Sequence, residues 1–205
     1  MKFLNILTVK KESDNTIFLN YVKWTSQCDS YFTDYSCWPD QCCYQASLKI
    51  LNDYGITTDR SQQVIIAQSS SSDCSVLSTN KNFEQAIKII DESLEVHKLP
   101  IMVGVHHLYY NKSKFEWYHK CSGNSPSITN HFVVIVGKGY DKTKKQDFYR
   151  FYEVGTSHEN KGKSAENRLY IDRKNKLIIG NTSYVEDYDE YYTITEVRKN
   201  VGKNY

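Results

Sequence analysis

Apolar residues recur at helical spacing in two segments of the chain, residues 41–54 and 83–97. Asp40 precedes the first segment and predicts an N-cap, while Gly55 follows it and predicts the helix end. Asn82 is the corresponding cap of the second segment. The stripe positions are Cys43, Ser47, Ile50 and Tyr54 in the first segment, and Phe83, Ala86, Ile87, Ile90 and Leu94 in the second. We therefore expect two amphipathic helices in the first half of the chain.

The second half of the chain changes to short apolar runs separated by polar turns, a pattern typical of strands. We expect strands at 101–108, 132–140, 147–154 and 191–198 and a hairpin at 168–180, after two earlier strand-like stretches at 3–9 and 17–24. Helices that precede a meandering sheet indicate an α+β fold. The expected organisation is a single domain, 1–205, with a helical part at about 25–99 and an antiparallel sheet at about 100–200.

Composition and charge exclude several classes of protein. The 205 residues are 40% hydrophobic and 14% aromatic, which suffices for a sizeable core. The formal net charge is only +2, with lysines interspersed among acids, so nucleic acid is not an expected partner. No apolar run has the length of a membrane span, and residues 1–9 lack the features of a cleaved signal peptide. We expect a protein made in the cytoplasm, with no membrane association, whose export would need a specialised secretion system.

The cysteines stand at positions 28, 37, 42, 43, 74 and 121. No CxxC pair and no HxxxH spacing accompanies them, so we expect neither a metal site nor a cofactor. Cys28 and Cys37 could form a disulfide if the protein works outside the cytoplasm.

Cys43 and His131 each lie in a setting that suits thiol chemistry. Cys43 falls in the first turn of the expected helix, where the backbone amides and the positive dipole end would stabilise a thiolate. His131 opens the apolar run that ends at Gly137, which places an imidazole at the start of a buried strand. The thiolate is the reactive form of cysteine and an imidazolium lowers its pKa, so the pair indicates a nucleophile and its base. The alternative at Cys43 is a buried structural cysteine.

These residues and their surroundings resemble the papain-like cysteine peptidase and amidase superfamily in its bacterial form, including double-glycine leader peptidase-like domains. The matching segments are Cys43–Gly55, Pro100–Val105, Asn130–Gly137 and Phe151–Thr156. The resemblance implies a papain-like fold in which a helical half carrying the nucleophile packs on an antiparallel sheet carrying His131. It also implies that Glu153, where the family has Asp or Asn, orients His131. The alternative for Glu153 is an ordinary solvent-facing acid at a strand end.

Two assignments within the site stay open. Cys42 is an alternative nucleophile, although the helix register favours Cys43. The family's oxyanion hole combines an upstream side-chain amide with the amide of the nucleophile, and Gln27 and Gln41 are both candidates. Gln27 is favoured because it lies sixteen residues before Cys43, far enough for a separate loop to fold over the site.

The resemblance implies a cysteine hydrolase that cleaves an amide bond through a thioester intermediate. A lone domain of this kind is similar to antibacterial effectors exported by type VI secretion, which attack peptidoglycan peptides or proteins. The expected partners are therefore a peptide or peptidoglycan substrate and a cognate immunity protein. The alternatives are a housekeeping cysteine peptidase, an acyltransferase with the same residues, and a non-catalytic papain-like binding module.

Overall fold

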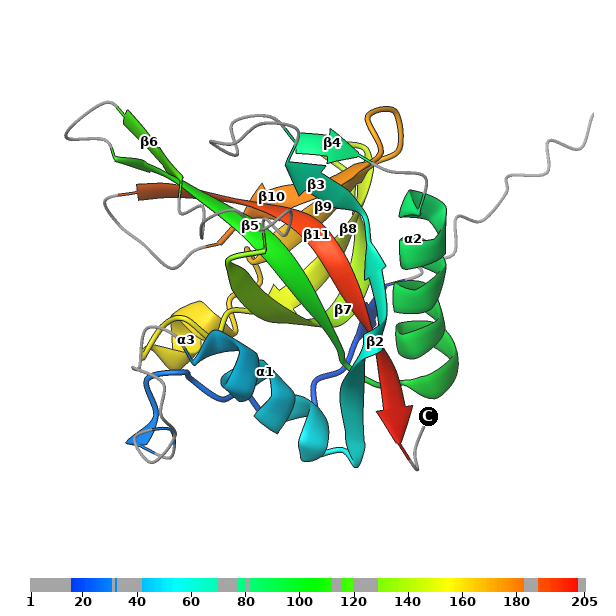
Figure 1. Cartoon of the computed structure of the whole chain (residues 1–205), viewed down its shortest axis with the longest axis vertical. Coiled ribbons are helices and arrows are strands. Elements are labelled where there is room, and N and C mark those ends of the chain that lie inside the picture. Colours follow the sequence, from blue (N-terminus) through cyan, green and yellow to red (C-terminus); the bar gives the residue numbers. More distant parts are fainter. Residues whose placement is uncertain are drawn as a thin grey trace, which may run out of the picture.

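A computed structural model describes residues 16–30, 32, 42–69, 77–79, 82–111, 116–119, 129–182 and 188–202. Within these residues the chain is mostly β, and its centre is a closed six-stranded antiparallel barrel (Figure 1). The barrel strands are β5 (Ile101–Asn111), β7 (His131–Asp141), β8 (Gln146–Tyr152), β9 (Arg168–Asp172), β10 (Leu177–Asn181) and β11 (Tyr188–Gly202). They follow the order β7–β8–β9–β10–β11–β5, and a further pairing between β5 and β7 closes the ring.

Five shorter or peripheral strands complete the β structure. They are β1 (Ile17–Phe18), β2 (Ile56–Ile65), β3 (Ala67–Ser69), β4 (Leu77–Thr79) and β6 (Glu116–His119). β1 pairs with β7, β2 with β11 and β6 with β5, all antiparallel. β3 and β4 form a separate two-stranded sheet.

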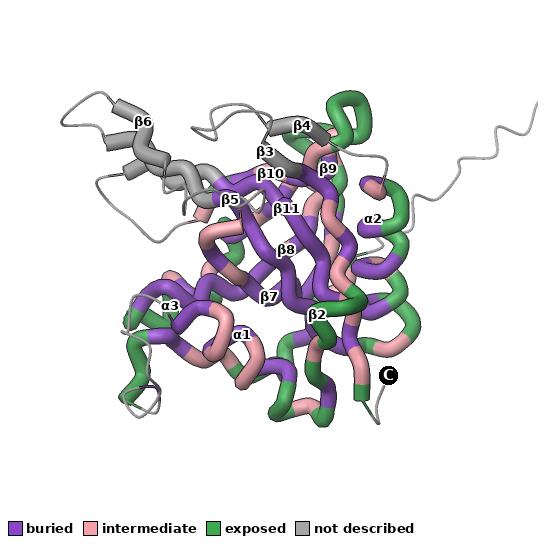
Figure 2. Tube along the Cα trace, viewed as in Figure 1, coloured by how far each residue is buried: buried purple, intermediate pink, exposed green. Residues whose placement is uncertain are grey.

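Most of the described barrel residues near its middle are buried (Figure 2), and many of them are aromatic or branched. Phe151 on β8 and Tyr192 on β11 have ring centroids 5.8 Å apart, although their strands are not neighbours, so this contact crosses the interior. Directly paired residues point to the same face of a sheet. His131 pairs with Val105, and Val105 pairs with Ile194, which shares a face with Tyr192. His131 therefore points into the interior, at the end of the barrel where β7 begins.

Helices cover the outside of the barrel (Figure 1). α1 (Cys43–Asn52) packs mainly on β7 and β2, while α2 (Phe83–Asp91) packs on β11. A π-helical segment, η3 (Glu92–His97), continues α2, and the single turn α3 (Glu159–Gly162) follows β8. In the part of the chain that the structure describes, no helix has the length and apolarity of a membrane span.

The expected papain-like α+β fold is wrong. No helical half packs on one face of a sheet; α1 and α2 lie apart, each on the barrel surface (Figure 1). The β5–β7 pairing closes the sheet, so one part of the core lies inside the barrel. A second part includes buried residues of the two helices, such as Ile50 and Ile90. In the sequence, β2 falls between α1 and α2, where the patterns predicted no strand. Its sequence has few apolar positions and most of its residues are exposed or half-buried, so no alternating pattern marks it.

Several local predictions are confirmed. Both helices, the hairpin β7–β8 and the hairpin β9–β10 lie where the patterns placed them. The strand expected at 17–24 is only the two residues of β1, and the strand expected at 3–9 lies outside the described residues.

Candidate functional site

Cys43 is the first residue of α1, at the end where a helix leaves its backbone amides without intrahelical acceptors. The residue at the N-cap is Cys42, which makes no side-chain cap hydrogen bond, and the expected cap, Asp40, lies outside the described residues. α1 begins at Cys43, two residues after the predicted start at position 41. The positive end of the helix dipole lies near the Cys43 thiol and favours its ionised form.

His131 connects Cys43 to Glu153. The ring is hydrogen-bonded to the Cys43 thiol, and its Nε2 lies 2.7 Å from Oε1 of Glu153. Because Nε2 faces the carboxylate, Nδ1 is the ring nitrogen left for the sulfur. The backbone N–H of Phe132 also donates to the thiol. The structure therefore brings the expected nucleophile, base and orienting acid together in one hydrogen-bonded series.

The carboxylate of Glu153 is fully buried. Its Oε1 accepts the backbone N–H of Gly155 at 2.6 Å, and its Oε2 accepts the Tyr192 hydroxyl at 2.7 Å. A buried carboxylate is costly unless it is paired and hydrogen-bonded, and these donors hold it in one orientation toward His131. The alternative of an ordinary solvent-facing acid is wrong for this residue.

The backbone of Glu153 is held from two sides. Trp24 Nε1 donates to its carbonyl oxygen at 2.7 Å, and its own N–H donates to the carbonyl of Gly162 in α3 at 2.9 Å. A Cβ at Gly162 would lie 2.4 Å from the Trp24 indole, and a Cβ at Gly155 would lie 2.8 Å from Oε1 of Glu153. Two glycines therefore permit the close packing that fixes the carboxylate.

Burial and charge shift the pKa values of all three groups. Burial would raise the pKa of the Cys43 thiol, but the hydrogen bond to His131 and its charge outweigh burial and lower this pKa. Burial would lower the pKa of His131, yet the Glu153 charge and the thiol raise it well above 6.5. Burial would raise the pKa of Glu153, and the charge and hydrogen bond of His131 lower it instead. All three directions favour the charged forms, a thiolate and an imidazolium beside an ionised carboxylate.

Gln27 lies beside the loop that carries Glu153. Its backbone N–H donates to the carbonyl of Val154 at 2.8 Å, and the neighbouring Ser26 hydroxyl donates to the carbonyl of Thr156 at 2.6 Å. The Gln27 side chain is buried, and its Oε1 has no hydrogen-bond partner among the residues that the structure describes. Its role in an oxyanion hole stays a prediction. The other candidate, Gln41, lies outside the described residues.

The cysteines near the site differ in oxidation state. Cys42 is disulfide-bonded, whereas Cys43 and Cys28 are free. Only a thiolate can act as the nucleophile, so in this oxidised state Cys43, and not the alternative Cys42, has the required form. Because Cys28 is a free, exposed thiol, the disulfide suggested between Cys28 and Cys37 is not formed.

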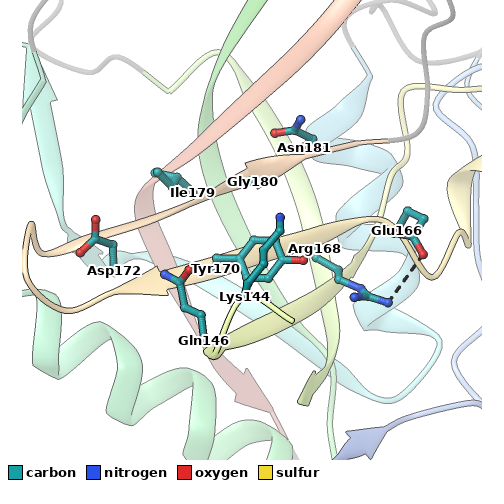
Figure 3. A pocket seen from close by; sticks show the side chains of 9 residues that line it. All are labelled: Lys144, Gln146, Glu166, Arg168, Tyr170, Asp172, Ile179, Gly180 and Asn181. Carbon is teal, nitrogen blue, oxygen red and sulfur yellow. Dashed lines mark ion pairs between the residues drawn. The ribbon is translucent and has the colours of Figure 1, made fainter. Parts of the chain in front are cut away.

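A surface hollow of about 510 Å³ on the outer face of β8, β9 and β10 contains none of these residues (Figure 3). Several of its polar groups are engaged within the protein. Arg168 Nη1 and the Tyr170 hydroxyl both donate to Oδ2 of Asp141, at 3.2 and 2.9 Å. Gln146 Nε2 donates to the carbonyl of Ile171 at 3.0 Å. The hollow is therefore a polar surface feature separate from the candidate site.

Tyr192 and Trp24 were missed by the sequence analysis. Both bind Glu153, one at the carboxylate and one at the backbone. The available signal was chemical, because a buried Tyr hydroxyl or Trp N–H usually finds a polar partner. The sequence could not show that Glu153 is the partner of Tyr192, because this contact depends on the barrel closure that brings β11 opposite β8.

Among the residues that the structure describes, no group of three or more His, Cys, Asp or Glu could hold a metal ion. Comparisons with protein-family models, with curated proteins and with solved structures find no match. Function has therefore to be inferred from the geometry of the site.

Proposed function

We propose that the protein is a cysteine hydrolase that cleaves an amide bond through a thioester intermediate. The observation that carries the proposal is the buried, hydrogen-bonded series Cys43–His131–Glu153. A thiol, an imidazole and an orienting carboxylate in this order are the parts that nucleophilic acyl transfer requires. They come from α1, from β7 and from the residue after β8, so the barrel and its covering helix position all three.

The geometry supports a two-step reaction. The Cys43 thiolate attacks the substrate carbonyl, and the His131 imidazolium gives its proton to the departing amine, which leaves a thioester on Cys43. His131, now neutral, takes a proton from a water molecule as the hydroxide adds to the thioester. Collapse releases the carboxylic acid and restores the thiolate and the imidazolium. Glu153 keeps Nε2 protonated and stabilises the positive ring in both steps.

We further propose that the protein is an antibacterial secreted effector that acts on peptidoglycan peptides or on proteins, and that an immunity protein protects the producing cell. The disulfide at Cys42 supports a site of action outside a reducing compartment, because disulfides persist mainly where thiols are oxidised. A chain of net charge +2 is also compatible with an anionic cell-wall substrate.

The first test is the reactivity of Cys43 toward iodoacetamide at pH 6, mapped by mass spectrometry. An ordinary thiol, with a pKa of about 8.5, is nearly inert at this pH, whereas a thiolate paired with an imidazolium reacts. Cys28 is the internal control because it is free and exposed in the same molecule. If Cys43 reacts no faster than Cys28, the protein is not a thiol hydrolase, and a non-catalytic binding module becomes the better hypothesis.

The second test identifies the bond that is cut. Purified protein is incubated with peptidoglycan fragments and, separately, with an unfolded protein, and the products are analysed by mass spectrometry. Hydrolysis gains one water per bond, while an acyltransferase with the same residues would yield an acyl adduct of an added amine. If Cys43 is reactive but the protein cleaves neither substrate, the cell-wall and protein substrates are removed from the proposal.

A further inference from the structure

A buried ion pair on β11 lies close to the proposed nucleophile and base. Arg198 Nε and Glu196 Oε1 are 2.6 Å apart, and their side chains are only 9% and 5% exposed. Moving two charges out of water is expensive, and apolar residues of similar volume often give equal or greater stability. The pair therefore needs a reason beyond holding the fold together.

The surrounding backbone makes room for this pair. A Cβ at Gly104 would lie 2.6 Å from Cγ of Glu196, so glycine on β5 leaves space for the buried acid. The pairing of β11 with β5 shifts register between Ile194 and Glu196, and its pairing with β2 shifts between Arg198 and Asn200. Such irregularities re-aim side chains and are frequent next to active sites. Two of them bracket the ion pair.

Arg198 lies against the two aromatic rings that directly follow the proposed nucleophile and base. Its guanidinium carbon is 5.8 Å from the ring centroid of Tyr44, the residue after Cys43. It is 5.5 Å from the ring centroid of Phe132, the residue after His131. The two rings meet edge to face with centroids 5.1 Å apart. One cation therefore contacts both α1 and β7 at the positions next to the reacting groups.

We propose that the Glu196–Arg198 ion pair is a positioning element for the thiolate–imidazolium pair. The planar guanidinium packs on the Tyr44 and Phe132 rings, and Glu196 fixes its orientation. Each ring is one residue from a reacting group, and the Phe132 N–H also donates to the thiol. Movement of either ring changes the distance between the Cys43 sulfur and the His131 ring. This inference rests on the proposed cysteine hydrolase function.

The test is the double variant Glu196→Gln with Arg198→Met. It is made in a Cys28→Ser background, which leaves Cys43 as the one free thiol among the described residues. The double change removes both charges, since removal of one alone would leave the other buried and unpaired. The rate of Cys43 alkylation is measured from pH 5 to pH 9, together with the melting temperature. We expect the alkylation rate at pH 6 to fall about tenfold or more as the thiol approaches an ordinary pKa. We expect the melting temperature to change by only a few degrees.

The matched control is Asp141→Asn with Arg168→Met on the outer face of the barrel, where Figure 3 shows Arg168. This pair has the same chemistry, with Arg168 Nη1 3.2 Å from Asp141 and its guanidinium 4.8 Å from the centroid of an aromatic ring, Phe148. It should leave the alkylation profile unchanged. If the control variant alters the profile as much as the Glu196–Arg198 variant does, the positioning role is refuted.

Arg198→Lys keeps a cation beside Glu196 but not the planar group that packs on the rings, so it provides the test if the double variant does not fold. We expect an alkylation rate at pH 6 below that of the wild type. An unchanged pH profile in a folded variant would show that the ion pair is only structural. A wild-type Cys43 that is itself inert at pH 6 would instead refute the proposed function, so the two failures are distinguishable.

Discussion

Two carboxylates of this protein, Glu153 and Asp141, accept hydrogen bonds from the same three kinds of donor in different surroundings. The donors are a basic side chain, a tyrosine hydroxyl and backbone N–H groups. Glu153 binds an imidazole, the Tyr192 hydroxyl and a backbone N–H. Asp141 binds the guanidinium of Arg168, the Tyr170 hydroxyl and the backbone N–H groups that follow it in the β7–β8 turn. The Glu153 side chain has no solvent exposure, whereas that of Asp141 is 12% exposed and its cation is 25% exposed.

The cations make the functional difference. Arginine is always protonated, so the pair at Asp141 has one charge state and serves to fix a turn and two side chains. Histidine can gain and lose a proton, and the imidazole beside Glu153 also contacts a thiol. Hydrogen-bond counts alone would rate Asp141, with four donors, above Glu153, with three. Glu153 differs from Asp141 in two ways: it is fully buried, and its neighbour is a histidine that can gain and lose a proton.

Removal of the proposed nucleophile should have the largest effect of the changes at the candidate site. Cys43→Ala should reduce hydrolysis by at least about a thousandfold, because no other group can form the thioester. Circular dichroism and melting temperature should stay near those of the wild type. The matched variant is Cys28→Ser, which should keep full activity. Substantial hydrolysis by Cys43→Ala would show that the bond is cut by another group.

His131→Gln should have the next largest effect. Loss of proton transfer should cost between about a hundredfold and ten-thousandfold in turnover. In the wild type, thiolate exists above the lowered Cys43 pKa and imidazolium below the raised His131 pKa, so kcat/KM should be high between those two values and fall on both sides. The variant should lose Cys43 alkylation at pH 6 and recover it only near an ordinary thiol pKa of about 8.5. If wild type and His131→Gln were alkylated equally fast at pH 6, a thiolate–imidazolium pair between Cys43 and His131 would be contradicted.

Glu153→Gln should weaken turnover less than either change above. A hydrogen bond to a charged group contributes about 1.5–3 kcal/mol, which corresponds to about a tenfold to a hundredfold loss of rate. Because the Glu153 charge raises the pKa of His131, the alkaline fall of kcat/KM should move to lower pH. Asp141→Asn is the control and should leave both quantities unchanged. Full activity in Glu153→Ala would show that the carboxylate has no orienting role.

The sequence was sufficient for local structure and for three residues that the structure brings together in the candidate site, Cys43, His131 and Glu153. Helical spacing placed α1 with Cys43 in its first turn, and the apolar run after His131 placed the imidazole at the start of β7. Both features depend on a few neighbouring residues. The hairpin β7–β8 then follows from its turn, and it brings the residue after β8 beside the start of β7.

Longer-range contacts could not be predicted in the same way. Closure of the barrel depends on β5 pairing with β7 and on β11 pairing with β5, and no local pattern encodes those neighbours. The papain-like fold was inferred from local segments that occur in the closed barrel as well. The roles of Tyr192 and Trp24 at Glu153 follow only from that closure and from a loop far away in sequence.

Tyr192→Phe should have the smallest effect and tests the comparison most directly. It removes one neutral donor from Glu153 Oε2 and preserves the ring that packs against Phe151. The carboxylate keeps its bonds to His131 and Gly155, so we expect kcat to fall about twofold to tenfold and stability to fall by about 1–2 kcal/mol. Tyr170→Phe, which removes the equivalent bond to Asp141, should leave kcat unchanged. If both variants lose stability and neither loses turnover, Tyr192 is a structural residue, and its contact with Glu153 does not help to orient the imidazole.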